Sequence, residues 1–507
     1  EVLINEMLYG GNFRDRVSSS TMLNLPEWFV PGLISYIAYD TDFDTEAKIK
    51  SAILKGKSHK IHRLHGEDAK IAGHAFWRYL SETYGDPIVS QIVYMSRISK
   101  NVESGFLYVL GMPLKDVLND WFYYYQARYQ DEVAMRNEQP EDAEYFVKRP
   151  KKKYLYNQVK MAPDGRFIAY TTNQDGQYKI WLYNCATGKT KKILRRENRL
   201  DQIQDVSYPI LEWHPIGNLL TYTYERKGHI WLDFYNLDTK EVTSRELFYI
   251  DKVLAYDFSD DGQEIVFSAV DDGFTDIFVY SVTASTYNKI TNDIADEINP
   301  KFVYNSNKII FSSNRNTTQL KFEKDIAPPV TENFDIYIFD YKNNTEELTR
   351  ITNSWRIDET KPIEYKTDKY FYLTNLNGIS NRGYAAIDST ISFVDTSIHY
   401  RNLTKTYPIS NRAYNITDYD YNQSTWEFTD VVKKEKKYSL FTNMVNPKLR
   451  PDANEFQDTW FKNYYNELNE WDSLLKIQIE EYKADTVVAS FVPNFITDTL
   501  IDINNYI

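Results

Sequence analysis

The feature that most constrains the fold of this chain is a repeat that begins near residue 154. Each copy has a short strand pattern, a tight turn often made by Asp-Gly, a strand rich in β-branched and aromatic residues, and then an Ile-aromatic-apolar-Tyr pattern. The clear copies begin near residues 159, 211, 256 and 300, a weaker one at 361 and another at 414. The spacing is roughly 45–50 residues, which is typical of one antiparallel propeller blade.

One blade cannot bury both of its faces, so several must close into a ring. The motif Pro/Ser-Asp-Gly-x-x-Ile-Ala-Phe, followed by Asp-Ile-Tyr, resembles the TolB-type, WD-like propeller over about residues 150–443. Rings of that family usually have six blades, and six copies can be placed here. We therefore predict a six-bladed β-propeller over residues 154–443.

An insertion interrupts the fourth copy from Arg315 to Asn333. Long loops of this kind often carry binding, and a solvated loop without a function is the alternative.

A second pattern lies at the start of the chain. Metallopeptidases of the H-E-x-x-H type place two His side chains one helical turn apart, so that both bind zinc, and the Glu between them acts as general base. In the segment from residue 4 to residue 9, Asn5 and Tyr9 occupy the His positions, and only the base position, Glu6, is retained.

Residues 1 to about 125 resemble the gluzincin peptidases in their cell-envelope, peptidase-MA-like branch. The resemblance extends to residues 25–36, 73–85 and 106–121, in the order that this family has them. It places the third zinc ligand at Pro31, which cannot bind a metal. The resemblance therefore implies a pseudopeptidase with no zinc, no cofactor and no catalytic residue.

One histidine run is the only sequence feature that would rescue a metal site. His59, His62 and His65 are three residues apart, so on a helix their rings would share a face. Lys57, Lys60 and Arg63 crowd the run and disfavour a cation, so we interpret it as a basic surface segment. His74 lies in an apolar helix pattern and is interpreted as a packed residue.

Composition excludes several classes of function. The net charge is −13, which argues against a general nucleic-acid binder, because such proteins need a basic face. Cys185 is the only cysteine, so no disulfide forms within the chain. No apolar run approaches the ~20 residues that cross a bilayer, so we expect no transmembrane span in this chain. The chain opens within a helix pattern, from which we expect the first domain to be incomplete.

The whole is predicted to be a multidomain α+β protein. A mostly helical pseudo-metallopeptidase domain (1–135) is followed by a charged, proline-punctuated linker (136–153), the propeller (154–443) and a C-terminal segment (444–507). Within that segment, residues 455–482 carry aromatic residues near helical spacing, which predicts one amphipathic helix. Such a helix packs on its own chain or docks a partner.

The sequence predicts no catalytic site. The chain has no G-x-S-x-G nucleophile elbow and no phosphate-binding glycine loop. A degenerate peptidase joined to a TolB-like ring resembles large envelope proteins of Bacteroidota. The resemblance implies a periplasm-facing or outer-membrane-associated interaction scaffold whose partners are other envelope proteins, such as components of a secretion, assembly or motility complex. The alternatives are a residual metal-dependent peptidase, which predicts bound zinc, and a glycan-binding propeller with aromatic residues at one mouth.

Overall fold

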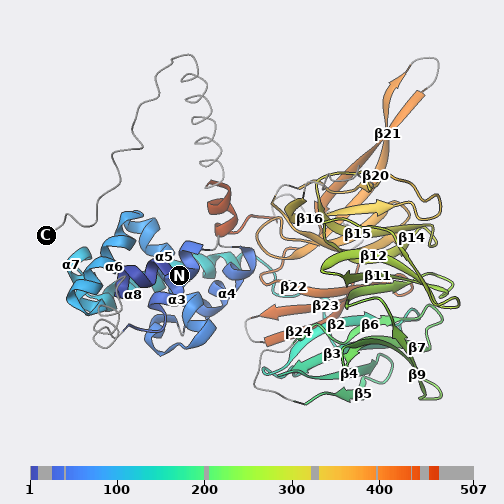
Figure 1. Ribbon diagram of the computed structural model, residues 1–507, viewed down its shortest axis with the longest axis horizontal. Helices are drawn as coiled ribbons and strands as arrows, with labels where there is room; N and C mark the ends of the chain where they lie inside the picture. Colours follow the sequence, from blue (N-terminus) through green and yellow to red (C-terminus); the bar gives the residue numbers. More distant parts are fainter. Residues whose placement is uncertain are drawn as a thin grey trace. The chain divides into compact units, whose positions relative to one another are not determined.

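The structure is a computed structural model that describes residues 2–9, 25–38, 42–56, 58–198, 205–320, 330–354, 356–394, 398–434, 437–445 and 456–467. Its N-terminal region is helical (Figure 1). The helices are α1 (Val2–Tyr9), α3 (Phe29–Ala38), α4 (Phe43–Leu54), the 3-10 helix η1 (Ser58–Arg63), α5 (Gly66–Tyr84), α6 (Pro87–Ser99), α7 (Val102–Leu110) and α8 (Leu114–Ala134).

Local sequence signals set the ends of several helices. Asp42 caps α4, because its carboxylate accepts a hydrogen bond of 2.6 Å from the Thr45 amide. Asn101 caps α7 in the same way, through the Ser104 amide at 3.1 Å. The α7 helix ends at Gly111, whose φ of 72° lies in the left-handed region that glycine adopts without strain.

The core of the helical region forms where α3 crosses α5. Gly32 and Gly73 meet at the crossing, and a Cβ added to Gly73 would lie 2.2 Å from the Trp28 carbonyl oxygen. Glycine is therefore required there. Large aromatic side chains surround the crossing, and the fully buried ones include Trp28, Phe29, Phe76, Trp77, Phe106 and Trp121.

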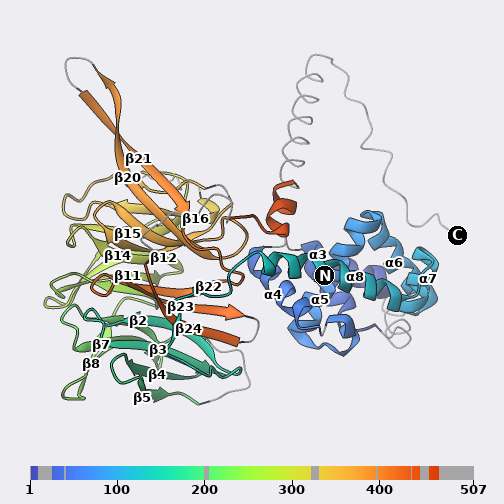
Figure 2. The ribbon, with the colours of Figure 1, turned by 180° about the vertical axis from the view of Figure 1, so that it is seen from behind.

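Six four-stranded antiparallel sheets follow, as the repeat predicted, and the six-bladed ring is confirmed (Figures 1 and 2). Blade 1 contains β2 (Leu155–Met161), β3 (Phe167–Gln174), β4 (Gln177–Asn184) and β5 (Lys189–Arg196). Blade 2 contains β6 (Ile210–Trp213), β7 (Leu219–Arg226), β8 (His229–Asn236) and β9 (Val242–Leu247). Blade 3 contains β10 (Lys252–Phe258), β11 (Glu264–Asp271), β12 (Phe274–Ser281) and β13 (Thr286–Lys289).

The second half of the ring has the same strand order. Blade 4 contains β14 (Glu297–Val303), β15 (Lys308–Arg315), β16 (Val330–Phe339) and β17 (Thr349–Arg350). Blade 5 contains β18 (Glu359–Lys366), β19 (Lys369–Thr374), β20 (Asn381–Val394) and β21 (Ile398–Pro408). Blade 6 contains β22 (Ile416–Asn422), β23 (Glu427–Lys434), β24 (Lys437–Met444) and β1 (Glu144–Tyr145).

The last blade takes its outer strand from the segment that precedes the first blade. Glu144 pairs with Thr442 and Tyr145 pairs with Phe441, so β1 closes the ring. Residues 136–153 were expected to be only a linker. Part of this segment instead belongs to the propeller, since β1 pairs with β24 at Phe441 and Thr442.

Apolar cores lie between neighbouring blades. One cluster joins each pair, for example Val159 and Tyr170 of blade 1 with Val431 and Leu440 of blade 6. The other five clusters join blades 1–2, 2–3, 3–4, 4–5 and 5–6. This arrangement is the reason that no blade is stable alone: each of its faces is covered by its neighbours.

Two features of the ring depart from the sequence prediction. The insertion was placed at Arg315–Asn333, but Arg315 is the fully buried last residue of β15 and β16 begins at Val330, so the insertion is shorter. Residues 321–329 lie outside the described residues. A second, unpredicted feature is the long β20–β21 hairpin, which extends past the other strands of blade 5 (Figures 1 and 2).

Beyond the ring, residues 460–467 form a short helix in which Trp460 stacks on Tyr464, with ring centroids 5.6 Å apart. The rest of the predicted 455–482 helix lies outside the described residues. No described helix is both long enough and apolar enough to cross a membrane.

Candidate functional site

The centre of the ring is lined by the first strand of every blade. A cavity of about 60 Å³ lies there, with both polar and apolar walls. Three lysines reach it, Lys160 from β2, Lys301 from β14 and Lys361 from β18. We call this the central channel.

Each channel lysine is paired with a carboxylate. Glu212 lies between Lys160 and Lys301, with N–O distances of 2.6 and 2.7 Å. Lys301 also contacts Asp257 at 2.9 Å, and Lys361 contacts Asp418 at 2.5 Å. Burial acts to raise the pKa of Glu212, but the two ammonium groups outweigh it, and this pKa lies below its ordinary value. Glu212 is therefore held as a carboxylate.

The channel carboxylates also join neighbouring blades. Asp418 and Asp420 of blade 6 accept hydrogen bonds of 2.8 Å from the backbone amides of Val159 and Met161 in blade 1. Asp257 of blade 3 does the same for the Phe302 amide of blade 4, also at 2.8 Å. Burial raises the pKa of Asp420 to about 6. These carboxylates are committed to holding the inner strands together.

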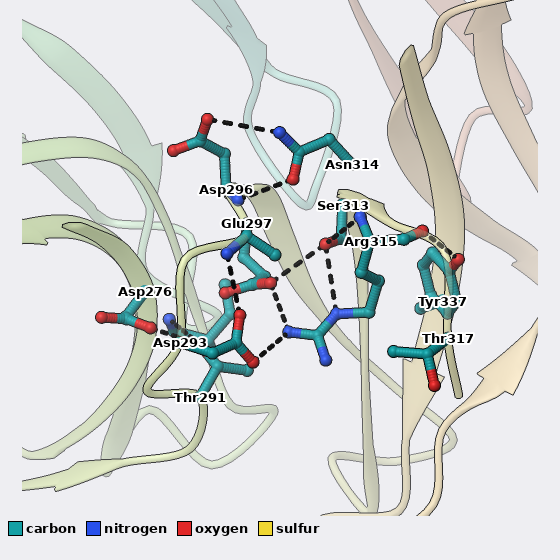
Figure 3. Close-up of polar contacts among 12 residues, drawn as sticks. Asp276, Thr291, Asp293, Asp296, Glu297, Ser313, Asn314, Arg315, Thr317 and Tyr337 are labelled. Atoms are coloured by element: carbon teal, nitrogen blue, oxygen red, sulfur yellow. Dashed lines mark hydrogen bonds and ion pairs between the residues drawn. The ribbon is translucent and has the colours of Figure 1, made fainter. Parts of the chain in front are cut away.

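A second polar cluster lies between blades 3 and 4 (Figure 3). The Arg315 guanidinium is fully buried and contacts Glu297 at 2.5 Å and Asp293 at 3.1 Å. Ser313 donates to the same Glu297 carboxylate oxygen, at 3.0 Å. Burial raises the pKa of Glu297 to about 7 against the effect of Arg315.

The boundary between blades 4 and 5 repeats this arrangement without the arginine. Glu359 takes the position of Glu297 and accepts from the Ser354 hydroxyl at 3.1 Å. Asp335 lies beside it and is bound by Arg350 at 2.5 Å. Burial raises the pKa of Glu359 to about 7, and the nearby Asp335 adds to the increase.

The predicted pseudopeptidase positions lie on two separate helix pairs. The α1 helix, with Asn5, Glu6 and Tyr9, packs on α6, and Arg97 of α6 donates to the Met7 carbonyl oxygen at 3.1 Å. Pro31 is exposed on α3, which packs on α5. The gluzincin-like identity of this region stays a prediction.

The histidine run does not form one helical face. The segment of η1 has a kink at Lys60, whose φ and ψ are −105° and 44°. His65 lies before α5 and pairs with Glu27 at 2.5 Å, and His62 is exposed. The side chain of His59 lies outside the described residues. Among the side chains that the structure describes, no group of three His, Cys, Asp or Glu residues is placed to hold a metal ion.

His74 lies in the core of the helical region, where the sequence placed it. It is 1% exposed, and its Nδ1 lies 3.1 Å from the Ser35 hydroxyl. Burial and then the neighbouring Arg78 lower the pKa of His74 to about 4, so its imidazole is neutral at physiological pH.

Sequence reasoning missed the channel lysines and Arg315. The sequence does contain a signal for the polar cluster around Arg315. The segments Thr-Asn-Asp (291–293) and Thr-Asn-Ser (352–354) both precede an Asp-Glu pair. The recurrence of these polar residues between predicted strands, with one extra residue in the second copy, indicates related polar clusters at two blade boundaries.

Comparisons with known proteins find only distant likeness. No protein-family model matches the chain. No curated protein sequence matches it either. Among solved structures, TolB from Acinetobacter baumannii is 14% identical with a TM-score of 0.35, over 66% of this chain and 71% of that one.

Two further structures show the same level of likeness. A putative TolB from Agrobacterium tumefaciens is 14% identical with a TM-score of 0.33, over 52% of this chain and 86% of that one. An oligogalacturonate lyase in complex with manganese is 10% identical with a TM-score of 0.39, over 62% and 96%. Matches at these scores say nothing about the activity or partners of this chain.

Proposed function

We propose that this protein is a non-catalytic interaction scaffold of the bacterial cell envelope, and that the propeller is its docking module. One observation carries the proposal. The channel is small, and its three lysines are bound to carboxylates that also join neighbouring blades, which supports a structural role for this cluster. Large apolar side chains are exposed on the outer loops instead, including Phe248 and Tyr249.

The envelope setting and the class of partner rest on the sequence resemblances. A degenerate gluzincin-like region followed by a TolB-type ring is the organisation expected of an outer-membrane-associated secretion, assembly or motility complex. Asn5, Tyr9 and Pro31 at the ligand positions support a region that has lost zinc chemistry and serves as a second binding surface.

The test is affinity purification of the tagged full-length protein from native envelopes, with cross-linking mass spectrometry on the eluate. The proposal expects stoichiometric envelope proteins cross-linked to the propeller loops. Recovery of the protein alone, with one zinc per chain and proteolysis that Glu6→Gln abolishes, would overturn it in favour of a peptidase.

A further inference from the structure

The face of the ring that carries the strand 2–3 and strand 4–1 connections exposes several large apolar side chains at blade 3. The connections β9–β10, β11–β12 and β13–β14 share that face, because the strands alternate in direction and each blade restarts in the same sense. They present Phe248, Tyr249, Phe274 and Ile294, with exposed fractions of 58%, 88%, 47% and 47%. We call these four residues the blade 3 patch.

Tyr249 is held in a conformation that disfavours a bulky residue. Its φ is 62°, in the left-handed region, where glycine or asparagine fits at lower cost. Trp426 has a similar φ of 60°, but it packs edge-to-face against Tyr365 with centroids 5.6 Å apart. Tyr249 makes no hydrogen bond or ring contact with any residue that the structure describes. Among the described residues, no hydrogen bond or ring contact therefore compensates for the strain at Tyr249.

The patch is bordered by carboxylates. Asp251 and Asp272 come from adjacent connections, and the Asp272 amide donates to the Asp251 carboxylate at 3.1 Å. Neither side chain forms an ion pair with a described residue. Asp271 is paired with Lys289 at 3.2 Å, and Lys252 is bound by Asp205 at 2.7 Å. The local cations are thus already engaged, and the border stays acidic.

Blade 2 differs from blade 3 in the charges that it brings to this face. On blade 2, the β7–β8 turn carries exposed Arg226 and Lys227. These two cations would repel a basic ligand, so such a ligand should bind at blade 3 in preference to this turn.

We propose that the blade 3 patch docks a protein segment in which Lys or Arg residues flank an aromatic or aliphatic core. Tyr249 and Phe248 would cover the apolar side of that segment, and Asp251 and Asp272 would meet its cations. Aromatic residues are enriched at protein interfaces, and polar residues form the rim around them. This inference rests on the proposed scaffold function and names the chemistry of the partner.

The probe is a fluorescein-labelled helical peptide of alternating Lys and Leu blocks, and its matched control has Glu in place of every Lys. Fluorescence anisotropy with the full-length protein measures Kd. We expect Phe248→Ser/Tyr249→Asn to raise Kd by about tenfold or more, and Asp251→Asn/Asp272→Asn by about fivefold, with binding that weakens in salt.

Ile216→Ser is the matched control, because Ile216 is 66% exposed on the β6–β7 turn of the opposite face. It should leave Kd unchanged. Equal binding of the Glu peptide, or unchanged Kd in both patch variants, would overturn the proposal. So would dimerisation of the protein in ultracentrifugation that Tyr249→Asn abolishes, since the occupant would then be a second copy.

The scaffold function can survive the loss of this site. If native purification recovers stoichiometric partners whose cross-links avoid residues 248–296, the scaffold stands and the patch fails. If the protein is recovered alone, the scaffold fails whatever the peptide does.

Discussion

The boundary between blades 3 and 4 and the boundary between blades 4 and 5 use one hydrogen-bond pattern. At the first, the Thr291 hydroxyl accepts from the Ile277 amide at 2.9 Å, and at the second, Thr352 accepts from Ile336 at the same distance. The side-chain oxygen of Asn314 accepts from the Asp296 amide at 2.8 Å, and that of Asn375 from the Asp358 amide at 2.9 Å.

The difference between the two boundaries is one ion pair. Arg315 and Asp293 are both present at the first, whereas Ser354 stands two residues after the threonine at the second, where Asp293 stands at the first. The additional ion pair between Arg315 and Asp293 carries no net charge. The pKa of the buried glutamate is about 7 in both places. The comparison teaches that a buried arginine and aspartate, present together, leave the pKa of the glutamate close to that at the boundary that lacks both.

The largest expected effect comes from removing only one member of that pair. Arg315→Met leaves Asp293 and Glu297 buried without their cation, and should lower the free energy of unfolding by about 3–5 kcal/mol at pH 8. The loss should be smaller at pH 6, because Glu297 then takes up a proton. Urea unfolding at the two pH values measures it.

The double variant Arg315→Met/Asp293→Ser rebuilds the second boundary and should recover most of that loss. The surface control is Arg166→Met, which removes an exposed pair with Asp164 and should change stability by no more than about 0.5 kcal/mol. No recovery in the double variant would show that the two boundaries are not equivalent.

Glu359→Gln should stabilise the protein. Glu359 has a folded-state pKa of about 7 against an ordinary value of 4.5, so its contribution to stability is fully present below pH 4.5 and is lost as the pH rises through 7. Glutamine stays neutral throughout. The variant should therefore match the wild type at pH 4 and exceed it by roughly 3 kcal/mol at pH 8.

The measurement is the denaturant midpoint of both proteins across that pH range. A Glu359→Gln variant that is less stable than the wild type at pH 8 would contradict a raised pKa at this boundary.

Glu212→Gln in the central channel should lower the free energy of unfolding, in contrast to Glu359→Gln. The pKa of Glu212 is lowered, so its stabilising contribution is present above the ordinary value of 4.5 and is lost as the pH falls through the lowered pKa. The variant removes the carboxylate from Lys160 and Lys301 and should cost roughly 2 kcal/mol at pH 8. Thermal unfolding at pH 8 and pH 4 checks it, and a cost that grows toward acid would refute the ion pairs.

The smallest expected effect is at the blade 3 patch. Tyr249→Asn should raise the free energy of unfolding by up to about 1 kcal/mol, because asparagine tolerates the left-handed conformation. Trp426→Asn is the comparison, since it removes a ring that packs edge-to-face on Tyr365 and should destabilise the protein. Equal effects of the two substitutions would mean that Tyr249 is packed as well.

Much of the ring could be predicted from short segments. The turn at Asp164-Gly165 and its equivalents, with the Ile-aromatic strands that follow, placed the blades because both signals depend on residues close in sequence. The polar clusters could not be found in that way. The Asp418 carboxylate that binds the Val159 amide is 259 positions away along the chain, and no local pattern indicates such a pair.

The N-terminal region shows the same limit of local sequence patterns. The packed His74 follows from the apolar helix pattern around it, whereas the pairing of α1 with α6 and of α3 with α5 does not follow from any local pattern. A helix pattern states which face is apolar and leaves open which neighbour covers it.

By itself, the sequence determined the blade number and the strand order within each blade, while the zinc-ligand positions assigned to Asn5, Tyr9 and Pro31 by the gluzincin resemblance stay a prediction. The tertiary structure decided the use of β1 to close the ring, the neutralisation of the channel lysines and the exposure of Tyr249. The physical reason is how far apart along the chain the interacting residues are. Turns and strands are set by backbone preferences over a few residues, while charge pairing and exposure depend on which distant strands the closed ring brings together.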